Sequence, residues 1–316
     1  MTSLADEFAS EFEGRRVLVT GATGFIGKNL CHALTALRAN VTGLSRSAGT
    51  SNVPEGVVPL AADLRAYAEA SKALGQADPE LIFHLAGYVT ASPDPMLMLP
   101  MFEANAVGTV NLLAAASELK CARLILVASA EALGAEGGPR SGSPYAASKL
   151  VAEMYGNLFH RLCGLPVVTL RLFLTYGPWQ QPSKLIPYTI LKLLRGEAPV
   201  LTSGERVCDV IYVEDVVRGL LKAAVAPDGV LGAQLDLGTG KGLTIRELVE
   251  RVAQLVGSSV SPVFGGLPDR PNEAVALADV TRTRSLLGWS PRWSLEEGLR
   301  GTVRWYRRYA ESGGPL

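Results

Sequence analysis

Short aliphatic runs alternate along most of the chain with longer segments in which apolar residues recur at helical spacing. The runs that have the length of buried strands are 17–19, 41–44, 57–61, 81–85, 123–128 and 167–173. The segments of helical period between them include 25–37, 66–74 and 103–119. This alternation predicts an α/β fold, in which helices cover both faces of a parallel sheet.

The pattern changes after Tyr176, where prolines at positions 178, 182, 187 and 199 interrupt it. We therefore expect two interleaved parts. Residues 1–175 and about 207–238 should form the larger domain, and about 176–206 and 239–316 a smaller lobe. Ser294 and Glu297 have the spacing of a capping box, which predicts the start of a final helix.

A glycine-rich turn, Gly-Ala-Thr-Gly-Phe-Ile-Gly at 21–27, joins the first strand to the first helix. A dinucleotide pyrophosphate needs a closely approaching backbone and a helix N-terminus with free N–H groups, and this context offers both. An ordinary tight turn is the alternative. The residues expected to bind a dinucleotide, on a Rossmann-type doubly wound sheet, are Gly21, Thr23, Gly24, Phe25, Ile26 and Gly27.

The second strand ends in Ser45 and Arg46, where an NAD enzyme usually carries an acidic residue for the ribose hydroxyls. A small hydroxyl residue followed by Arg suits the 2′-phosphate of NADP. We therefore expect NADP as cofactor, with NAD as the alternative. Arg46 could also be a solvated loop residue.

Tyr145 and Lys149 lie four residues apart, which places them on one face of a helix. A neighbouring ammonium favours the phenolate form of a tyrosine and so adapts it to proton transfer. Ser129 follows the fifth strand, at the carboxyl edge where open α/β sheets bind ligands. Taken singly, these features are also typical of a helix surface and of a turn or cap.

The order glycine turn, Asn105, Ser129, Tyr145, Lys149 resembles the short-chain dehydrogenase/reductase superfamily, in the extended branch that acts on nucleotide-diphosphate sugars. The resemblance runs from Val17 to about Tyr306. It implies that hydride moves between nicotinamide and a sugar carbon. Tyr145 would exchange the proton of the attached oxygen, Ser129 would polarise that oxygen, and Lys149 and Asn105 would support the transfer.

The same resemblance implies further contacts. For the cofactor these are Asp63 and Leu64 near the adenine, and Leu85, Ala86 and Gly87 along the ribose. For the substrate they are Lys184 and Leu185, at the entry to the smaller lobe, with Arg206 and Arg270. Leu174 and Cys208 stand where the family often carries Asn and Arg.

The residues after Ser129 depart from the 4,6-dehydratases of this branch, which carry Thr-Asp-Glu and use both carboxyl groups to eliminate water. This chain has Ser129-Ala130-Glu131. Ala130 cannot donate a proton, so dehydration by that route is disfavoured. Glu131 remains available as a base or as a hydrogen-bond partner for a hydroxyl.

Charge and composition narrow the class of partner. Lys+Arg and Asp+Glu both number 30, so net charge provides no attraction to nucleic acid or to an anionic membrane. The first 13 residues lack Lys and Arg, which is unlike a signal or transit peptide. Scattered cysteines without metal-ligand spacing predict no metal site and a reducing, cytoplasmic setting.

The helix that follows Tyr145 has a broad apolar face at 150–162, which predicts a homodimer.

These observations leave four hypotheses for function. The first is NADPH-dependent reduction of a nucleotide-diphosphate 4-keto(-6-deoxy) sugar, based on Ser45-Arg46 and Ser129-Ala130-Glu131. The second is a nucleotide-sugar 4-epimerase with tightly bound NAD, and the third a nucleotide-uronic acid decarboxylase. A non-catalytic NADP-binding sensor is the remotest, because such a protein is expected to lose Tyr145 or Lys149.

Overall fold

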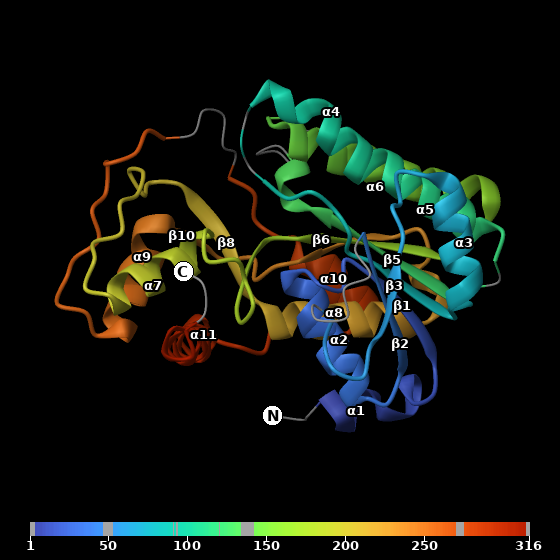
Figure 1. The fold of residues 1–316 in the computed structure, drawn as a ribbon, viewed down its shortest axis with the longest axis horizontal. Coiled ribbons are helices and arrows are strands. Elements are labelled where there is room, and N and C mark those ends of the chain that lie inside the picture. Colours follow the sequence, from blue (N-terminus) through green and yellow to red (C-terminus); the bar gives the residue numbers. More distant parts are fainter. Residues whose placement is uncertain are drawn as a thin grey trace.

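The computed structural model describes residues 4–46, 53–90, 92, 94–119, 121–133, 142–269 and 275–313. In that part of the chain, seven parallel strands form the sheet of the larger domain, in the order β3-β2-β1-β4-β5-β6-β9 (Figure 1). The strands are β1 (Arg16–Thr20), β2 (Asn40–Ser45), β3 (Val58–Ala61), β4 (Leu81–His84), β5 (Arg123–Ser129), β6 (Val167–Leu172) and β9 (Gln234–Leu237).

Helices cover both faces of this sheet, which confirms the doubly wound α/β fold expected from the alternating pattern. One face carries α2 (Phe25–Ala36), α8 (Val213–Val225) and α10 (Val280–Leu287), with α1 (Leu4–Phe12) packed on α2 and α8. The other carries α3 (Tyr67–Ala77), α5 (Gly108–Ser117) and α6 (Pro144–Cys163). Short helical turns lie between these elements: η2 (Pro95–Leu97), α4 (Met98–Met101), η3 (Phe102–Val107) and η4 (Ala130–Ala132).

The central strands are buried on both faces, which explains their uninterrupted aliphatic sequences. Val17 of β1 lies between Val41 of β2 and Leu81 of β4. The chain order reverses at this point, since β2 and β3 lie on one side of β1 and β4 to β6 on the other. Open sheets bind ligands outside the carboxyl ends of the strands at such a reversal.

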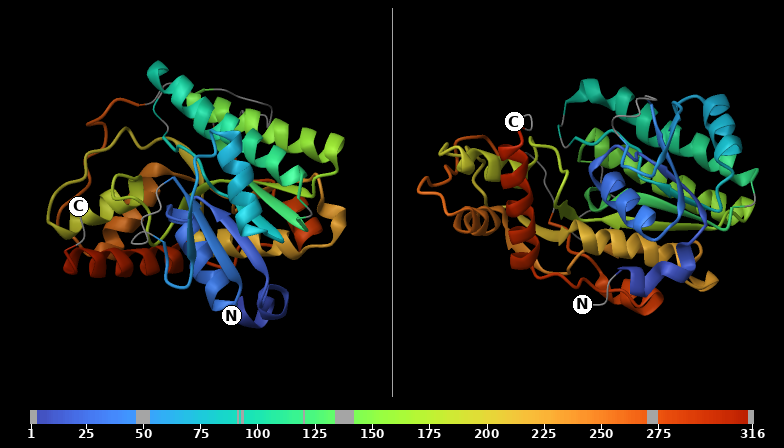
Figure 2. Two further views of the ribbon diagram at one scale, coloured as in Figure 1. Left: turned by 45° about the vertical axis from the view of Figure 1, so that its right-hand side comes forward. Right: turned by 60° about the horizontal axis from the view of Figure 1, so that its bottom comes forward.

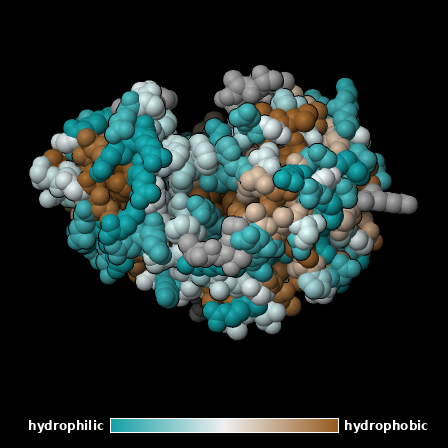
Figure 3. All heavy atoms as spheres, turned by 90° about the horizontal axis from the view of Figure 1, so that it is seen from below, coloured by the Kyte–Doolittle hydropathy of each residue, from teal (hydrophilic) through white to brown (hydrophobic). Residues whose placement is uncertain are grey.

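A three-stranded sheet, in the order β10-β8-β7, forms the base of the smaller lobe. Its strands are β7 (Leu174–Tyr176), β8 (Val207–Tyr212) and β10 (Gly242–Thr244), and its helices are α7 (Leu185–Leu194), α9 (Ile245–Val256) and α11 (Leu295–Glu311). The short turn η5 (Asp228–Val230) precedes β9. Figure 2 shows the lobe beside the larger domain, and the space-filling view shows a notch between them (Figure 3).

Two segments lie outside the parts to which the sequence assigned them. We expected 207–212 in the larger domain, but β8 pairs with β7 in parallel and with β10 antiparallel. We expected 280–287 in the smaller lobe, yet α10 packs on β9 of the main sheet. The chain therefore crosses between the parts more often than the break in composition indicates.

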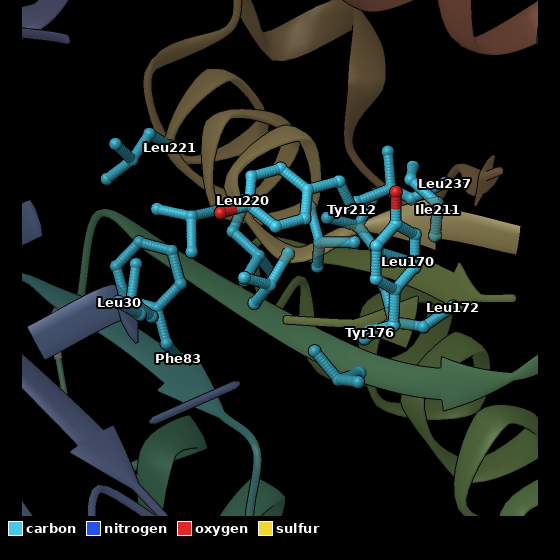
Figure 4. Close-up of a cluster of buried hydrophobic side chains, with 14 of the residues drawn as sticks. Leu30, Phe83, Leu170, Leu172, Tyr176, Ile211, Tyr212, Leu220, Leu221 and Leu237 are labelled. Atoms are coloured by element: carbon cyan, nitrogen blue, oxygen red, sulfur yellow. The ribbon is translucent and has the colours of Figure 1, made fainter. Parts of the chain in front are cut away.

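Apolar side chains of the helices α2 and α8 pack against apolar side chains of the main sheet. Figure 4 shows Leu220 of α8 near Leu30 of α2, Phe83 of β4 and Leu170 of β6, and each of these side chains is fully buried. At the C-terminal end, the predicted capping box is present. The Glu297 N–H donates to Ser294 Oγ at 3.3 Å, and the Ser294 N–H donates to the Glu297 carboxylate at 3.0 Å.

Candidate functional site

The glycine turn leads from β1 into α2 with little room for side chains. Gly21 has φ +70°, and a Cβ there would lie 2.8 Å from the Ala86 nitrogen. A Cβ on Gly27 would lie 2.1 Å from the Gly21 carbonyl oxygen. These two positions accept only glycine without movement of the backbone, so the sequence holds the helix N-terminus close to the end of the strand.

The N-terminus of α2 is suited to a phosphate group. Gly24 is its N-cap and offers no side-chain acceptor. Within the described residues, no acceptor satisfies the backbone N–H groups of Phe25, Ile26 and Gly27, while Thr23 lies in the turn just before them. Free N–H groups and the positive end of the helix dipole together bind anions. These residues therefore fit a dinucleotide pyrophosphate.

The end of β2 lies beside the segment that follows β3, because Ser45 pairs with Ala61. Arg46 is exposed, and its charge contributes to a lowered pKa of the Asp63 carboxyl. The larger contribution comes from Arg65, whose guanidinium lies 2.5 Å from Asp63 Oδ2. Two arginines and one aspartate thus gather at the end of β2, where the family resemblance predicts the adenosine half of a dinucleotide, and Leu64 is buried in the core.

Tyr145 and Lys149 lie on the first turns of α6, which starts at the N-cap Ser143 with Pro144 as its first residue. Both side chains are buried, with 7% and 6% of their surface exposed. The Lys149 ammonium donates a hydrogen bond to the Val127 carbonyl of β5 at 2.9 Å. The helix therefore holds both groups over the carboxyl end of the sheet.

Burial shifts the pKa values of both Tyr145 and Lys149. It raises the pKa of the Tyr145 phenol, and the Glu131 carboxylate adds to this rise, while a hydrogen bond with Ser129 opposes it. Burial lowers the pKa of Lys149 to about 8. We expected Lys149 to lower the pKa of Tyr145, but the structure does not show this. Lys149 makes its hydrogen bond to the Val127 carbonyl, and burial dominates at the phenol.

Ser129 is the last residue of β5 and lies beside Tyr145, as their hydrogen bond shows. It also caps the turn η4, because its Oγ accepts the Glu131 N–H at 3.2 Å. Ala130 is buried beside Phe173 and Ala278, whereas Glu131 is exposed. The structure thus brings Ser129, Glu131 and Tyr145 together, with a methyl group at position 130.

Asn105 is almost fully buried in η3, a π-helical turn between α4 and α5. Its side chain accepts the Tyr88 N–H at 2.6 Å and donates to Ser148 Oγ at 2.9 Å. Tyr88 follows Gly87, where a Cβ would lie 2.9 Å from Asn105 Oδ1. Asn105 therefore connects the segment of Leu85, Ala86 and Gly87 to the helix of Tyr145.

Sequence reasoning missed His84, the last residue of β4. It is 2% exposed, with its ring nitrogens 2.7 Å from Thr20 Oγ1 and 2.9 Å from Thr109 Oγ1. A histidine at the end of the apolar run Leu81-Ile82-Phe83 was the available signal. Its polar ring needs partners that only the folded chain supplies.

The expected substrate contacts lie in the smaller lobe. Lys184 is the N-cap of α7, Leu185 is its first residue, and Arg206 precedes β8. Arg270 lies outside the described residues. Asp209 of β8 accepts the backbone N–H groups of Thr239, Gly240 and Ala278 at 2.8 to 3.1 Å, so its role is to hold loops.

Arg171 has a structural role as well. Its Nε donates to the buried Glu153 carboxylate of α6 at 2.9 Å, and the same guanidinium contacts Gln234 of β9. Among the described side chains, no group of three or more His, Cys, Asp or Glu residues could bind a metal ion. The polar groups that converge at the carboxyl edge fit the dinucleotide and proton-transfer site expected from the sequence.

Residues 17–238 match the model of the NAD dependent epimerase/dehydratase family. The chain belongs to this family. It is 31% identical to the dTDP-glucose 4,6-dehydratase of Streptomyces niveus, over 92% of this chain and 93% of that protein. It is 32% identical to the UDP-glucose 4-epimerase of Mycolicibacterium smegmatis, over 94% and 100%.

Solved structures agree with this assignment. The Thermus thermophilus UDP-glucose 4-epimerase in complex with NAD superimposes with a TM-score of 0.84 at 30% identity, covering 92% of this chain and 99% of that one. The UDP-glucose 4-epimerase of Thermotoga maritima with UDP-glucose gives 0.87 at 27% identity, covering 93% and 99%. The chain is therefore an enzyme of the extended short-chain dehydrogenase/reductase kind, from a family of NAD-dependent enzymes that act on nucleotide sugars.

Proposed function

We propose that the protein is a nucleotide-diphosphate-sugar 4-epimerase with NAD as its retained cofactor. The observation that carries the proposal is Ala130, a methyl group between Ser129 and Glu131 at the carboxyl edge of the sheet. The dehydratase relatives need an acid there to eliminate water. Without it, the site retains the groups for oxidation and reduction at one sugar carbon, which is the chemistry of its epimerase relatives.

The residues divide this chemistry between them. Tyr145 accepts the proton of the sugar hydroxyl and later returns it, while the Ser129 hydroxyl holds the oxygen in place. Lys149 keeps a positive charge beside the reacting centre. Gly21, Gly24 and Gly27 at the N-terminus of α2 would hold NAD, which when bound would supply a reversible hydride acceptor.

Cofactor behaviour tests the proposal. The purified protein should release NAD on denaturation, as measured by chromatography. It should also interconvert UDP-glucose and UDP-galactose, or the corresponding dTDP sugars, without added cofactor, as followed by proton NMR. Absence of both bound NAD and interconversion across UDP-glucose, UDP-glucuronate and dTDP-glucose would overturn it.

A second candidate is an NADPH-dependent ketoreductase for a 4-keto sugar nucleotide. The observation that favours it is the end of β2, where Ser45 and Arg46 provide no carboxylate for a ribose and the Arg46 side chain is exposed. Arginine binds a 2′-phosphate well. This enzyme would purify without NAD and would oxidise one NADPH for each dTDP-4-keto-6-deoxyglucose reduced.

We also propose that the protein forms a homodimer through α4 and α6, which lie side by side (Figure 1). Both elements expose large apolar side chains: Met98 and Leu99 are 60% and 64% exposed, and Met154 and Leu162 are 63% and 76% exposed. Exposed apolar patches of this kind mark protein interfaces.

Residues 95–117 are apolar and long enough to span a membrane, but 39% of the most apolar window is already buried within the fold.

A further inference from the structure

A buried hydrogen-bond chain begins at the base of the glycine turn. The Ala86 N–H donates to Thr20 Oγ1 at 3.1 Å, and Thr20 Oγ1 lies 2.7 Å from His84 Nδ1. Thr20 is the last residue of β1 and His84 the last of β4, and neither exposes more than 2% of its surface. These two hydrogen bonds hold the segment after β4 against Gly21.

The chain continues from the same imidazole into the helices on the other side. His84 Nε2 lies 2.9 Å from Thr109 Oγ1 of α5, which donates to the Asn105 carbonyl at 2.5 Å. The Asn105 amide donates to Ser148 Oγ, and Ser148 Oγ donates to the Tyr145 carbonyl, at 2.9 and 2.8 Å. The imidazole joins the two halves of the hydrogen-bond chain at the ends of β1 and β4, and the bonds between Asn105 and the Tyr88 backbone join them a second time, further along the polypeptide.

For a neutral imidazole, only one arrangement of protons satisfies these bonds. Thr109 gives its hydrogen to the Asn105 carbonyl, so Thr109 Oγ1 must accept from His84 Nε2–H. His84 Nδ1 is then without a proton and accepts from the Thr20 hydroxyl. Burial, with a smaller contribution from the Lys149 charge, lowers the pKa of His84 to about 3 and keeps this neutral form at ordinary pH.

We propose that His84 is a positioning residue, which sets the placement of the Tyr145 helix relative to the glycine turn through its neutral Nε2–H form. Proton and hydride transfer need the phenol and the nicotinamide within a few tenths of an ångström of their working positions. β1 and β4 form one end of this connection, and the π-helical turn with Asn105 forms the other. The proposal depends on the Tyr145 chemistry proposed above.

The tautomer provides a test that needs no substrate. The chain contains only 3 histidines, so ring nitrogen signals can be assigned by two-bond ¹H–¹⁵N NMR of the full-length protein and of a His84→Gln variant. The His84 signals should show a neutral ring protonated at Nε2, unchanged between pH 5 and 8. An Nδ1–H tautomer, or titration within this range, would overturn the proposal whatever the substrate is.

Thr109 offers a matched pair of variants for the positioning role. Thr109→Val keeps the volume but removes the hydroxyl between His84 and Asn105, whereas Thr109→Ser keeps it. Thr109→Val removes two buried hydrogen bonds, to His84 Nε2 and to the Asn105 carbonyl, and kcat should fall at least about tenfold. Thr109→Ser should restore kcat to within about twofold, and dinucleotide affinity should change less than twofold because the bonds of Thr20 and Ala86 remain.

The kcat and Tm of the two Thr109 variants distinguish a positioning role of this network from a role in stability alone. Both variants lose packing or bonding and can lower the Tm, but only Thr109→Val should lower kcat once both are folded by circular dichroism. Equal kcat in the two folded variants would overturn the proposal. So would a loss of dinucleotide affinity in step with kcat, since the network would then serve the cofactor turn alone. If the wild-type protein has no epimerase activity but His84 still shows the Nε2–H tautomer, the proposed function is wrong, whereas the predicted tautomer of His84 is not contradicted.

Discussion

At the scale of single residues, the phenol of Tyr145 is poised by opposing influences. Burial and the Glu131 carboxylate raise its pKa, and the Ser129 hydroxyl opposes them. A phenol that holds its proton tightly can donate to an oxygen that develops negative charge. It needs a nearby positive charge to act in the other direction. The Lys149 ammonium is one such charge, and a bound nicotinamide cation would supply another.

Tyr145→Phe removes the proton donor without changing the shape of the ring. Turnover should fall by about 10² to 10⁴, the usual range for a general acid or base, while NAD affinity measured by calorimetry stays within a few-fold. Tyr155→Phe is the matched control, because this residue lies on the same helix with 40% of its surface exposed. Full turnover in Tyr145→Phe would exclude the assigned role.

At the scale of elements, the site depends on how β1 passes into α2. Gly27 lies inside α2, where its missing side chain lets the Gly21 carbonyl approach. A π-helical turn similarly interrupts the run from α4 to α5 and places Asn105 toward Tyr88 and Ser148. Such turns often occur at functional sites. In both cases a local departure from regular structure orients the polar groups.

Gly27→Ala tests the tight passage from strand to helix. The new Cβ would lie 2.1 Å from the Gly21 carbonyl oxygen, so the turn must open and dinucleotide affinity should fall at least about tenfold. Gly75→Ala is the control, because Gly75 lies within α3 and a Cβ there meets nothing within 4 Å. That change should stabilise the protein by about 0.5–1 kcal/mol and leave affinity unchanged. Calorimetric titration and thermal melts distinguish the two; unchanged affinity in Gly27→Ala would contradict the cofactor role of this turn.

At the scale of the whole molecule, α6, the helix that carries Tyr145 and Lys149, also carries the proposed dimer surface. Tyr145 and Lys149 are on the buried side of α6, and Met154 and Leu162 are on its exposed side. Association would therefore cover the outer face of the helix that holds the proposed proton-transfer groups. We expect dimerisation to support the rigidity of that helix.

Leu162→Glu places a charge in the proposed interface. The wild-type protein should sediment as a dimer at micromolar concentration, and the variant should shift toward the monomer because an unpaired buried charge is costly. Leu267→Glu is the control, since Leu267 is 50% exposed on the smaller lobe. A monomeric wild-type protein, or an equal shift in both variants, would contradict the proposed interface.

The sequence by itself determined strands β1 to β6 of the main sheet, the glycine turn and the spacing of Tyr145 and Lys149, but not strand β9. These are local properties: strand and helix periods, the need for glycine in a tight passage, and residues four apart on one helical face. The capping box at Ser294 and Glu297 also follows from spacing alone and is present. Family membership followed from the order of these motifs.

Only the tertiary structure decided the rest, because it depends on residues distant along the chain. The assignment of β8 to the smaller sheet arises from pairing with β7 and β10. The raised pKa of Tyr145 arises from burial and from Glu131, and the part played by His84 from hydroxyls 64 positions before it and 25 after it. Burial and hydrogen-bond partners of this kind exist only once strands and helices have packed, so no local pattern could specify them.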